Sequence, residues 1–145
     1  MADRQQSYAN HRRLFWPYHL FVLPVLLAHV VNQIRYFWRA PSEGSAFAVL
    51  VAVSLLVLAL TVRTMVLTVQ NRVIRLEMQL RLRDILPSDL AGRINELTVP
   101  QLIALRFAAN AEIPALVREV LGGQLGTQTA IKKRIADWQG DHLRA

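Results

Sequence analysis

Hydrophobic positions and helix breakers divide this chain into an apolar first half and an amphipathic second half. The stretch 46–86 contains neither Pro nor Gly, is apolar as far as Leu60, and from Arg63 onward carries arginines among hydrophobic residues at helical spacing. Because Pro and Gly are the usual helix breakers, this pattern predicts one long helix. We expect its first part, 46–69, to cross a membrane and its second part, 70–86, to continue into the cytoplasm as a stalk.

An earlier apolar segment, 14–38, is bordered by aromatic residues at both ends. Trp16 and Trp38 are 22 residues apart, about 33 Å along a helix, which matches the thickness of a bilayer core with aromatics at its two head-group levels. The run is too long for the apolar part of a signal peptide and no small-residue cleavage site follows it. We therefore expect a retained transmembrane helix, with Pro17 in its first turn and a kink at Pro24.

The connection 39–45 is short enough to allow only a tight link between two antiparallel spans. Basic residues favour the cytoplasmic side of a membrane. Beside the connection lie Arg35 and Arg39, whereas the opposite side of the spans has Arg4, Arg12, Arg13, Arg63, Arg72 and Arg75. The sequence thus predicts an all-α membrane protein with a two-helix transmembrane hairpin, an external loop at 39–45, and a cytoplasmic location for both the tail 1–13 and the C-terminal part.

Polar residues within the predicted spans form one candidate site. His29, Asn32 and Gln33 share a face of the first span, and in an antiparallel hairpin His29 lies level with Ser54. Such groups are costly in contact with lipid. The pattern favours hydrogen bonds between the helices or to a neighbouring subunit. A proton relay, and an axial ligand role of His29 for haem or chlorophyll, stay open as alternatives.

The stalk 70–86 carries two hydrophobic seams. The first consists of Val73, Leu76 and Leu80, and the second of Ile74, Met78, Leu82 and Ile85. A helix with two apolar faces needs two packing partners. We expect the chain's own C-terminal helices on one seam, and a second copy, another protein or the membrane surface on the other.

Polar stripes separate these seams. One stripe places Glu77 and Arg81 at a favourable spacing for an ion pair. Arginines close to the membrane and a basic cluster near the C-terminus are expected to contact lipid head groups. These residues are Arg63, Arg72, Arg75, Lys132, Lys133 and Arg134.

Pro87 ends the stalk, and residues 87–145 predict a small cytoplasmic domain of short helices. The expected helix starts are Ser88, Thr98 with Gln101 as a capping box, Asn110, and Thr127 or Thr129. We expect helices at 88–97, at 98–109 and at 111–121, the last of these ended by Gly122 and Gly123. A final helix should bury Ile131, Ile135 and Trp138 and expose Lys132, Lys133 and Arg134. Because this domain is small, it should dock onto a seam of the stalk.

Candidate chemistry is sparse in this sequence. The chain has no Cys, no glycine-rich phosphate loop and no paired-histidine zinc motif. His142 beside Asp141 is typical of a surface pair near a chain end. The formal net charge of +7 comes mostly from arginines beside the apolar segments, which indicates anionic lipid rather than nucleic acid. We therefore expect no enzyme, no catalytic residues, no metal and no cofactor, with His29 as the single alternative cofactor ligand.

Four runs of the sequence resemble a small bacterial family that is a domain of unknown function: 70–77, 97–108, 112–117 and 131–138. The resemblance implies two spans in a bacterial inner membrane and a cytoplasmic helical tail, and it implies no activity. The polar residues His29, Asn32 and Gln33 within the spans and the stalk seam left without a partner in the chain favour a non-catalytic accessory or assembly subunit of a larger membrane complex, or a homo-oligomer. The alternatives are a subunit that binds haem or chlorophyll through His29, and a module that responds to anionic lipids.

Overall fold

The computed structural model describes residues 15–140, which fold into two compact units divided between Thr68 and Val69. Every named element in this range is a helix, so the predicted all-helical fold class is confirmed. The expectations for the tail 1–13 and for His142 beside Asp141 lie outside the described residues.

The first unit contains the π-helix η1 (Pro17–Val22), the helix α1 (Leu23–Arg39) and the first part of α2 (Glu43–Ile85). At the end of η1 the backbone N–H of Leu23 donates to the carbonyl of Tyr18, five residues earlier. Pro24 has no N–H with which to continue an ordinary helical ladder. A π-helical stretch therefore precedes Pro24, and the kink expected at Pro24 stays a prediction.

A reciprocal pair of serines begins α2. The hydroxyl of Ser42 accepts from the N–H of Ser45 at 3.1 Å, and the hydroxyl of Ser45 accepts from the N–H of Ser42 at 2.9 Å. Ser45 also donates to the carbonyl of Ala40 at 3.0 Å and is buried. These bonds satisfy backbone groups that a helix start leaves unpaired. The helix consequently begins at Glu43, and only residues 40–42 of the predicted loop 39–45 are outside helices.

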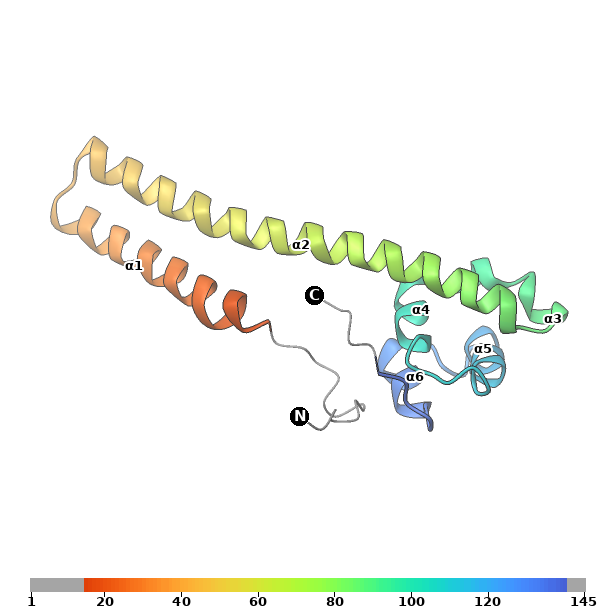
Figure 1. Cartoon of the computed structure of the whole chain (residues 1–145). Coiled ribbons are helices and arrows are strands. Elements are labelled where there is room, and N and C mark those ends of the chain that lie inside the picture. Colours follow the sequence, from red (N-terminus) through yellow and green to blue (C-terminus); the bar gives the residue numbers. More distant parts are fainter. Residues whose placement is uncertain (1–14, 141–145) are drawn as a thin grey trace. The chain divides into compact units, whose positions relative to one another are not determined.

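Helix α2 is continuous from Glu43 to Ile85 and contributes residues to both units (Figure 1). Its absence of Pro and Gly after Gly44 explains this length. The predicted continuity of 46–86 as one helix is confirmed to within a residue at its C-terminal end.

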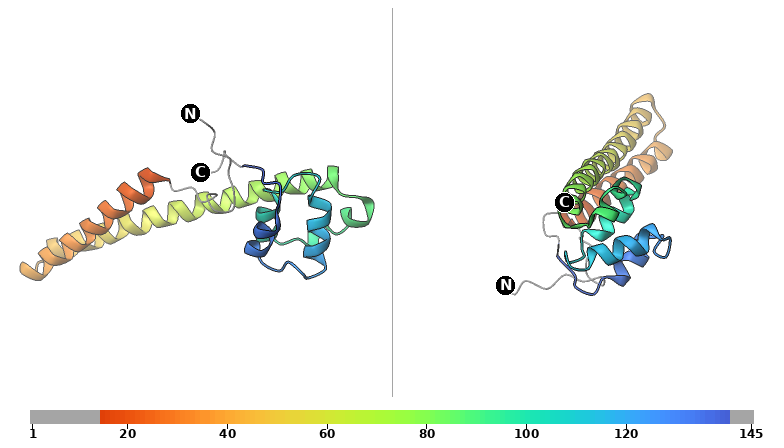
Figure 2. Two further views of the ribbon diagram at one scale, coloured as in Figure 1. Left: turned by 90° about the horizontal axis from the view of Figure 1, so that it is seen from below. Right: turned by 90° about the vertical axis from the view of Figure 1, so that its right-hand side faces the viewer.

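The second unit packs short helices against the C-terminal part of α2 (Figure 2). In chain order these are α3 (Ser88–Ala91), the 3-10 helix η2 (Ile94–Glu96), α4 (Val99–Leu105), α5 (Ile113–Leu121) and α6 (Gln128–Arg134). Fully buried side chains come from α2 and from all of the three longest of these helices, including Leu82, Leu102, Val117 and Ile131. One hydrophobic core thus joins them.

Three of the predicted helix signals are present in the structure. Thr98 and Gln101 form the capping box of α4, in which the N–H of Thr98 donates to the side-chain oxygen of Gln101 at 2.8 Å. The hydroxyl of Thr127 accepts from the N–H of Ala130 and caps α6. Gly123, with φ of +78°, follows the end of α5, a conformation that favours glycine.

Other predicted boundaries are wrong, because the helices are shorter than the hydrophobic pattern suggested. The first C-terminal helix starts after Pro87, whose carbonyl accepts from the N–H groups of Leu90 and Ala91, so Ser88 is not its cap. Helix α4 ends at Leu105, and Asn110 does not cap its neighbour.

The last helix ends at Arg134, so Ile135 and Trp138 are not on its face. Residues 135–139 are not helical: the backbone bends at Ala136 and Asp137, and Trp138 forms an isolated antiparallel bridge with Ala108. The N–H of Gln139 donates to the carbonyl of Phe107 at 2.7 Å, and the rings of Phe107 and Trp138 stack with centroids 4.6 Å apart. Backbone groups of residues 107–109 are thus hydrogen-bonded to residues 137–139 rather than within a longer α4.

Candidate functional site

The C-terminal part of α2 has two apolar faces with opposite environments. Ile74, Met78 and Leu82 are buried in the core formed with the chain's own short helices. The prediction that the chain's own C-terminal helices cover one seam is thereby confirmed, and the structure shows that this is the second seam. Residues at these spacings follow one side of a helix, so the short helices cover that side.

The other apolar face of α2 is exposed. Val73 is 47%, Leu76 62% and Leu80 61% exposed, and Val69, one turn before Val73, is 60% exposed. We call these four residues the exposed seam. Val69 was not predicted as part of this seam, although its spacing of four residues from Val73 indicates it. At about 100° per residue, the seam lies on the side of α2 opposite to Met78.

Two charged residues flank the exposed seam. Arg72 precedes Val73 and Glu77 follows Leu76, and both are exposed. Within residues 15–140 neither takes part in an ion pair. The predicted pairing of Glu77 with Arg81 is wrong, because Arg81 faces the short helices.

Arg81 fastens α2 to the loop between α4 and α5. Its guanidinium donates to the carbonyl of Arg106 at 3.1 Å, to the carbonyl of Ala108 at 2.8 Å and to the side-chain oxygen of Asn110 at 2.8 Å. Desolvation by burial lowers the pKa of Arg81, which still stays protonated at neutral pH. Five donors in a planar fork suit a loop that presents several oxygens.

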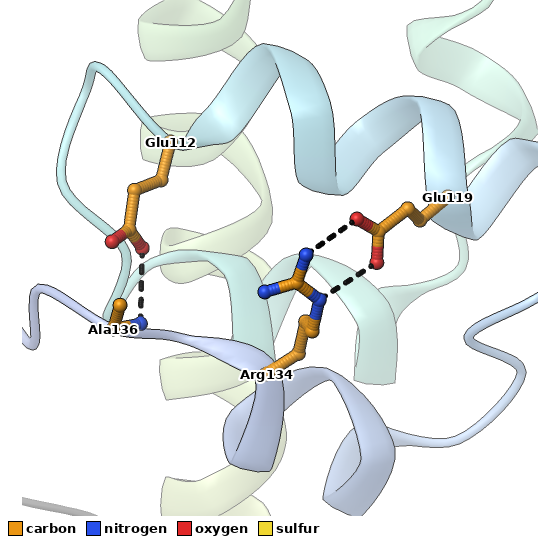
Figure 3. A network of polar contacts seen from close by, with 4 residues as sticks. All are labelled: Glu112, Glu119, Arg134 and Ala136. Carbon is orange, nitrogen blue, oxygen red and sulfur yellow. Dashed lines mark hydrogen bonds and ion pairs between the residues drawn. The ribbon is translucent and has the colours of Figure 1, made fainter.

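A second set of polar contacts closes the C-terminal segment of the bundle (Figure 3). The carboxylate of Glu112 accepts from the N–H of Ala136 at 3.3 Å and from that of Asp137 at 2.7 Å. Arg134 donates to both carboxylate oxygens of Glu119, at 3.2 and 3.1 Å. Glu112 thus ties the segment after α6 to the start of α5, and Arg134 ties the end of α6 to α5. These contacts hold together the short helices that pack against α2.

Comparison with known proteins gives a family. The model of a family of unknown function, DUF6526, matches residues 1–145. The chain belongs to this family. Its predicted resemblance to a domain-of-unknown-function family is thereby confirmed. No curated protein and no solved structure matches the chain.

The basic cluster of this DUF6526 chain is only partly exposed. Lys132 is 8% exposed, and its Nζ lies 5.3 Å from the ring centroid of Phe107. Its expected exposure is therefore wrong, because the side chain folds over an aromatic ring of the core. Lys133 is exposed and Arg134 binds Glu119. Their contact with lipid head groups stays a prediction, as does that of Arg72 and Arg75, which are exposed on α2.

The polar residues predicted within the spans are not joined by hydrogen bonds among the described residues. His29 and Asn32 are exposed and Gln33 is half-buried, while the hydroxyl of Ser54 donates to the carbonyl of Leu50 in its own helix at 2.8 Å. Hydrogen bonds from His29, Asn32, Gln33 and Ser54 to a neighbouring helix or subunit stay a prediction for this chain. A role of His29 as a cofactor ligand stays a prediction as well.

Arg63 lies beside a small apolar pocket of the first unit. The pocket has a volume of about 210 Å³ and is lined by Phe15, Tyr18, Val62, Arg63 and Val66. The guanidinium carbon of Arg63 is 5.8 Å from the ring centroid of Tyr18, whose hydroxyl donates to the carbonyl of Ala59 at 3.2 Å.

Residues 15–140 contain no group of three or more His, Cys, Asp or Glu side chains that could hold a metal ion.

Proposed function

We propose that this chain is a non-catalytic protein of the bacterial inner membrane that carries a cytoplasmic docking domain. It acts as an accessory or assembly subunit of a larger membrane complex, or as a homo-oligomer, and the exposed seam of α2 is its docking surface. The observation that carries the proposal is the contrast between the two faces of α2, one buried by the chain's own helices and the other apolar and open.

Apolar exposure in the first unit supports insertion into a membrane. The helices Pro17–Arg39 and Glu43–Ile85 contain windows of mean hydropathy 1.5 and 2.7, long enough to cross a bilayer. Their large apolar side chains are widely exposed, including Leu20, Phe21, Leu55 and Leu58. Soluble monomers rarely expose contiguous apolar patches larger than a few hundred Å². Lipid is the environment in which a two-helix hairpin with this surface is stable.

Charge supports an orientation with both termini in the cytoplasm. The connection at 40–42 is bordered by Arg35 and Arg39, whereas Arg63, Arg72 and Arg75 follow the second apolar run. The larger number of basic residues favours the cytoplasmic side. Arg63, at the end of the second apolar run, is placed to meet anionic head groups at the membrane surface.

The exposed seam lies outside the hydrocarbon in this arrangement. Asn71, Arg72 and Glu77 alternate with the seam residues on the same turns of α2, and charged side chains are costly inside a bilayer. The seam therefore meets water unless a protein covers it. Burial of such a face is the usual reason for an amphipathic stripe on a helix.

Single-cysteine labelling tests the membrane part of this proposal, because the natural chain contains no Cys. In intact cells, a membrane-impermeant maleimide should modify Pro41→Cys in the connection but not Arg83→Cys in α2. After permeabilisation it should modify both. Labelling of Arg83→Cys from outside, or extraction of the protein by alkaline carbonate, would contradict the proposed topology.

Affinity purification from native membranes in mild detergent tests the docking part. The tagged wild-type chain should retain a stoichiometric partner or a second, differently tagged copy. The variant Leu76→Ser with Leu80→Ser should lose it, whereas Arg75→Ser, an exposed change on the same helix away from the seam, should keep it. Equal retention by all three proteins would remove the exposed seam from the docking function.

A further inference from the structure

We infer that the exposed seam of α2 pairs with the same seam of a second copy of this chain, as a parallel and in-register coiled coil. This inference rests on the proposed function, since it names the partner of the proposed docking surface. Three observations favour a second copy: the spacing of the seam, the charges beside it, and the way the chain holds α2.

The spacing of the seam is that of a coiled coil. Val69, Val73, Leu76 and Leu80 are separated by four, three and four residues, the alternation of d and a positions in a heptad repeat. Val73 and Leu80 then occupy a positions, and Val69 and Leu76 occupy d positions. The central residues Val73 at a and Leu76 at d have the pattern that is typical of two-stranded parallel coils, whereas Val69 at d and Leu80 at a do not.

The flanking charges are complementary to those of a second copy. With Val73 at an a position, Arg72 is at g and Glu77 is at the next e. In a parallel coiled coil, a g residue meets the e residue that lies five positions further along the other helix. Arg72 of each copy therefore meets Glu77 of the other, and symmetry gives this attractive pair twice. Neither residue takes part in an ion pair within residues 15–140, so both are available for it.

The chain presents the seam on a helix that is already formed. Met78 and Leu82 bury the opposite face of α2 in the core, and Arg81 is bonded to the loop after α4. Preorganisation of this kind lowers the entropy cost of association. A short seam then suffices, because two copies held in one membrane have a high effective concentration.

The helix direction is also fixed in the proposed arrangement. Residues 43–85 form one helix, and its apolar part crosses the membrane in the same direction in every copy. Two seams that meet beside the membrane are therefore parallel, so each residue of the seam lies next to its own equivalent in the second copy.

Disulfide cross-linking of single-cysteine variants in native membranes tests this inference. With copper phenanthroline as oxidant, Val73→Cys, Leu76→Cys and Leu80→Cys should each give a dimer of twice the chain mass. Arg75→Cys, which is exposed but outside the seam, should give none. A seam that pairs in the antiparallel sense, or out of register, would not link each position to its own equivalent.

A charge exchange tests the pairing itself in the Leu76→Cys background. Arg72→Glu should lower the association constant roughly tenfold, because two attractive pairs become two repulsive ones. Adding Glu77→Arg to Arg72→Glu should restore the dimer to the level of the parent. No effect of the first change, or no recovery with the second, would contradict the proposed register.

Other outcomes separate this inference from the proposed function. A photo-reactive residue at Leu76 that links the chain to a different protein, with no dimer from the cysteine variants, would overturn the second copy but keep the docking surface. Absence of any adduct at the seam, by either method, would overturn both. Equal dimer formation by Arg75→Cys and Leu76→Cys would show collision rather than a defined interface.

Discussion

Arg81→Met is expected to loosen the short helices that follow Pro87 from α2 while leaving the apolar segments intact. The change removes three hydrogen bonds, to the backbone carbonyls of Arg106 and Ala108 and to the side chain of Asn110. Met retains much of the aliphatic volume of Arg, so the loss is chiefly one of polar contacts.

The magnitude follows from the burial of the three acceptors. The two backbone carbonyls are partly buried in these bonds, and loss of a partner should cost about 1 kcal/mol for each. Asn110 is exposed, so water replaces its bond and the cost is about 0.5 kcal/mol. The sum is about 2.5 kcal/mol, which corresponds to roughly 70-fold more frequent opening of the loop.

Hydrogen exchange followed by mass spectrometry, on the full chain in detergent micelles, measures this opening directly. Peptides that cover 105–113 should exchange about 70-fold faster in Arg81→Met than in the wild type. Arg81→Lys, which keeps the charge but not the planar fork, should recover only part of the protection. The control Arg83→Met changes an exposed arginine of the same helix and should differ from the wild type by less than about twofold. Equal exchange in Arg81→Met and Arg83→Met would refute the assignment of Arg81 as a structural contact.

Four further changes probe other parts of the second unit. Leu82→Ala should destabilise the core by about 3 kcal/mol, seen as faster exchange throughout the short helices, whereas Leu80→Ala should leave that exchange unchanged and weaken only docking. Glu112→Ala should release residues 135–139, because the Glu112 carboxylate accepts two of their N–H groups, and faster exchange should be confined to that segment and its neighbours. Gly123→Ala should lower the free energy of unfolding of the second unit by about 1 kcal/mol, because φ there is +78°, and a lower thermal midpoint would report this loss.

The long helix and the caps could be predicted from the sequence because their causes are local. Absence of helix breakers from 46 to 86 is enough for one continuous helix, and Thr98 with Gln101 carries its capping box within four residues. The two seams of the stalk follow from helical periodicity alone, but periodicity did not show which of them the short helices would cover.

The contacts that the sequence did not reveal depend on tertiary structure. Arg81 forms no pair with Glu77 because the loop after α4 presents backbone oxygens, and loop carbonyls leave no signal in the sequence. Lys132 is buried because its side chain lies over the ring of Phe107, a contact between α6 and the residues after α4 that helical periodicity cannot predict. The serine pair at the start of α2 was local and could have been found, since Ser42 and Ser45 have the spacing of a capping box.

Cysteine accessibility along α2 tests the central claim, that the C-terminal part of this helix is covered on two opposite faces. Each residue from 69 to 83 is changed to Cys, one at a time, and its rate of reaction with a water-soluble maleimide is measured in native membranes and again in dissociating detergent. In membranes, cysteines on the buried face, at 74, 78 and 82, should react slowly. Cysteines in the exposed seam, at 69, 73, 76 and 80, should also react slowly, whereas a cysteine at position 75 should react quickly. Detergent should accelerate only the exposed seam. If the seam reacts in membranes as quickly as position 75, no partner covers it and the docking function is contradicted.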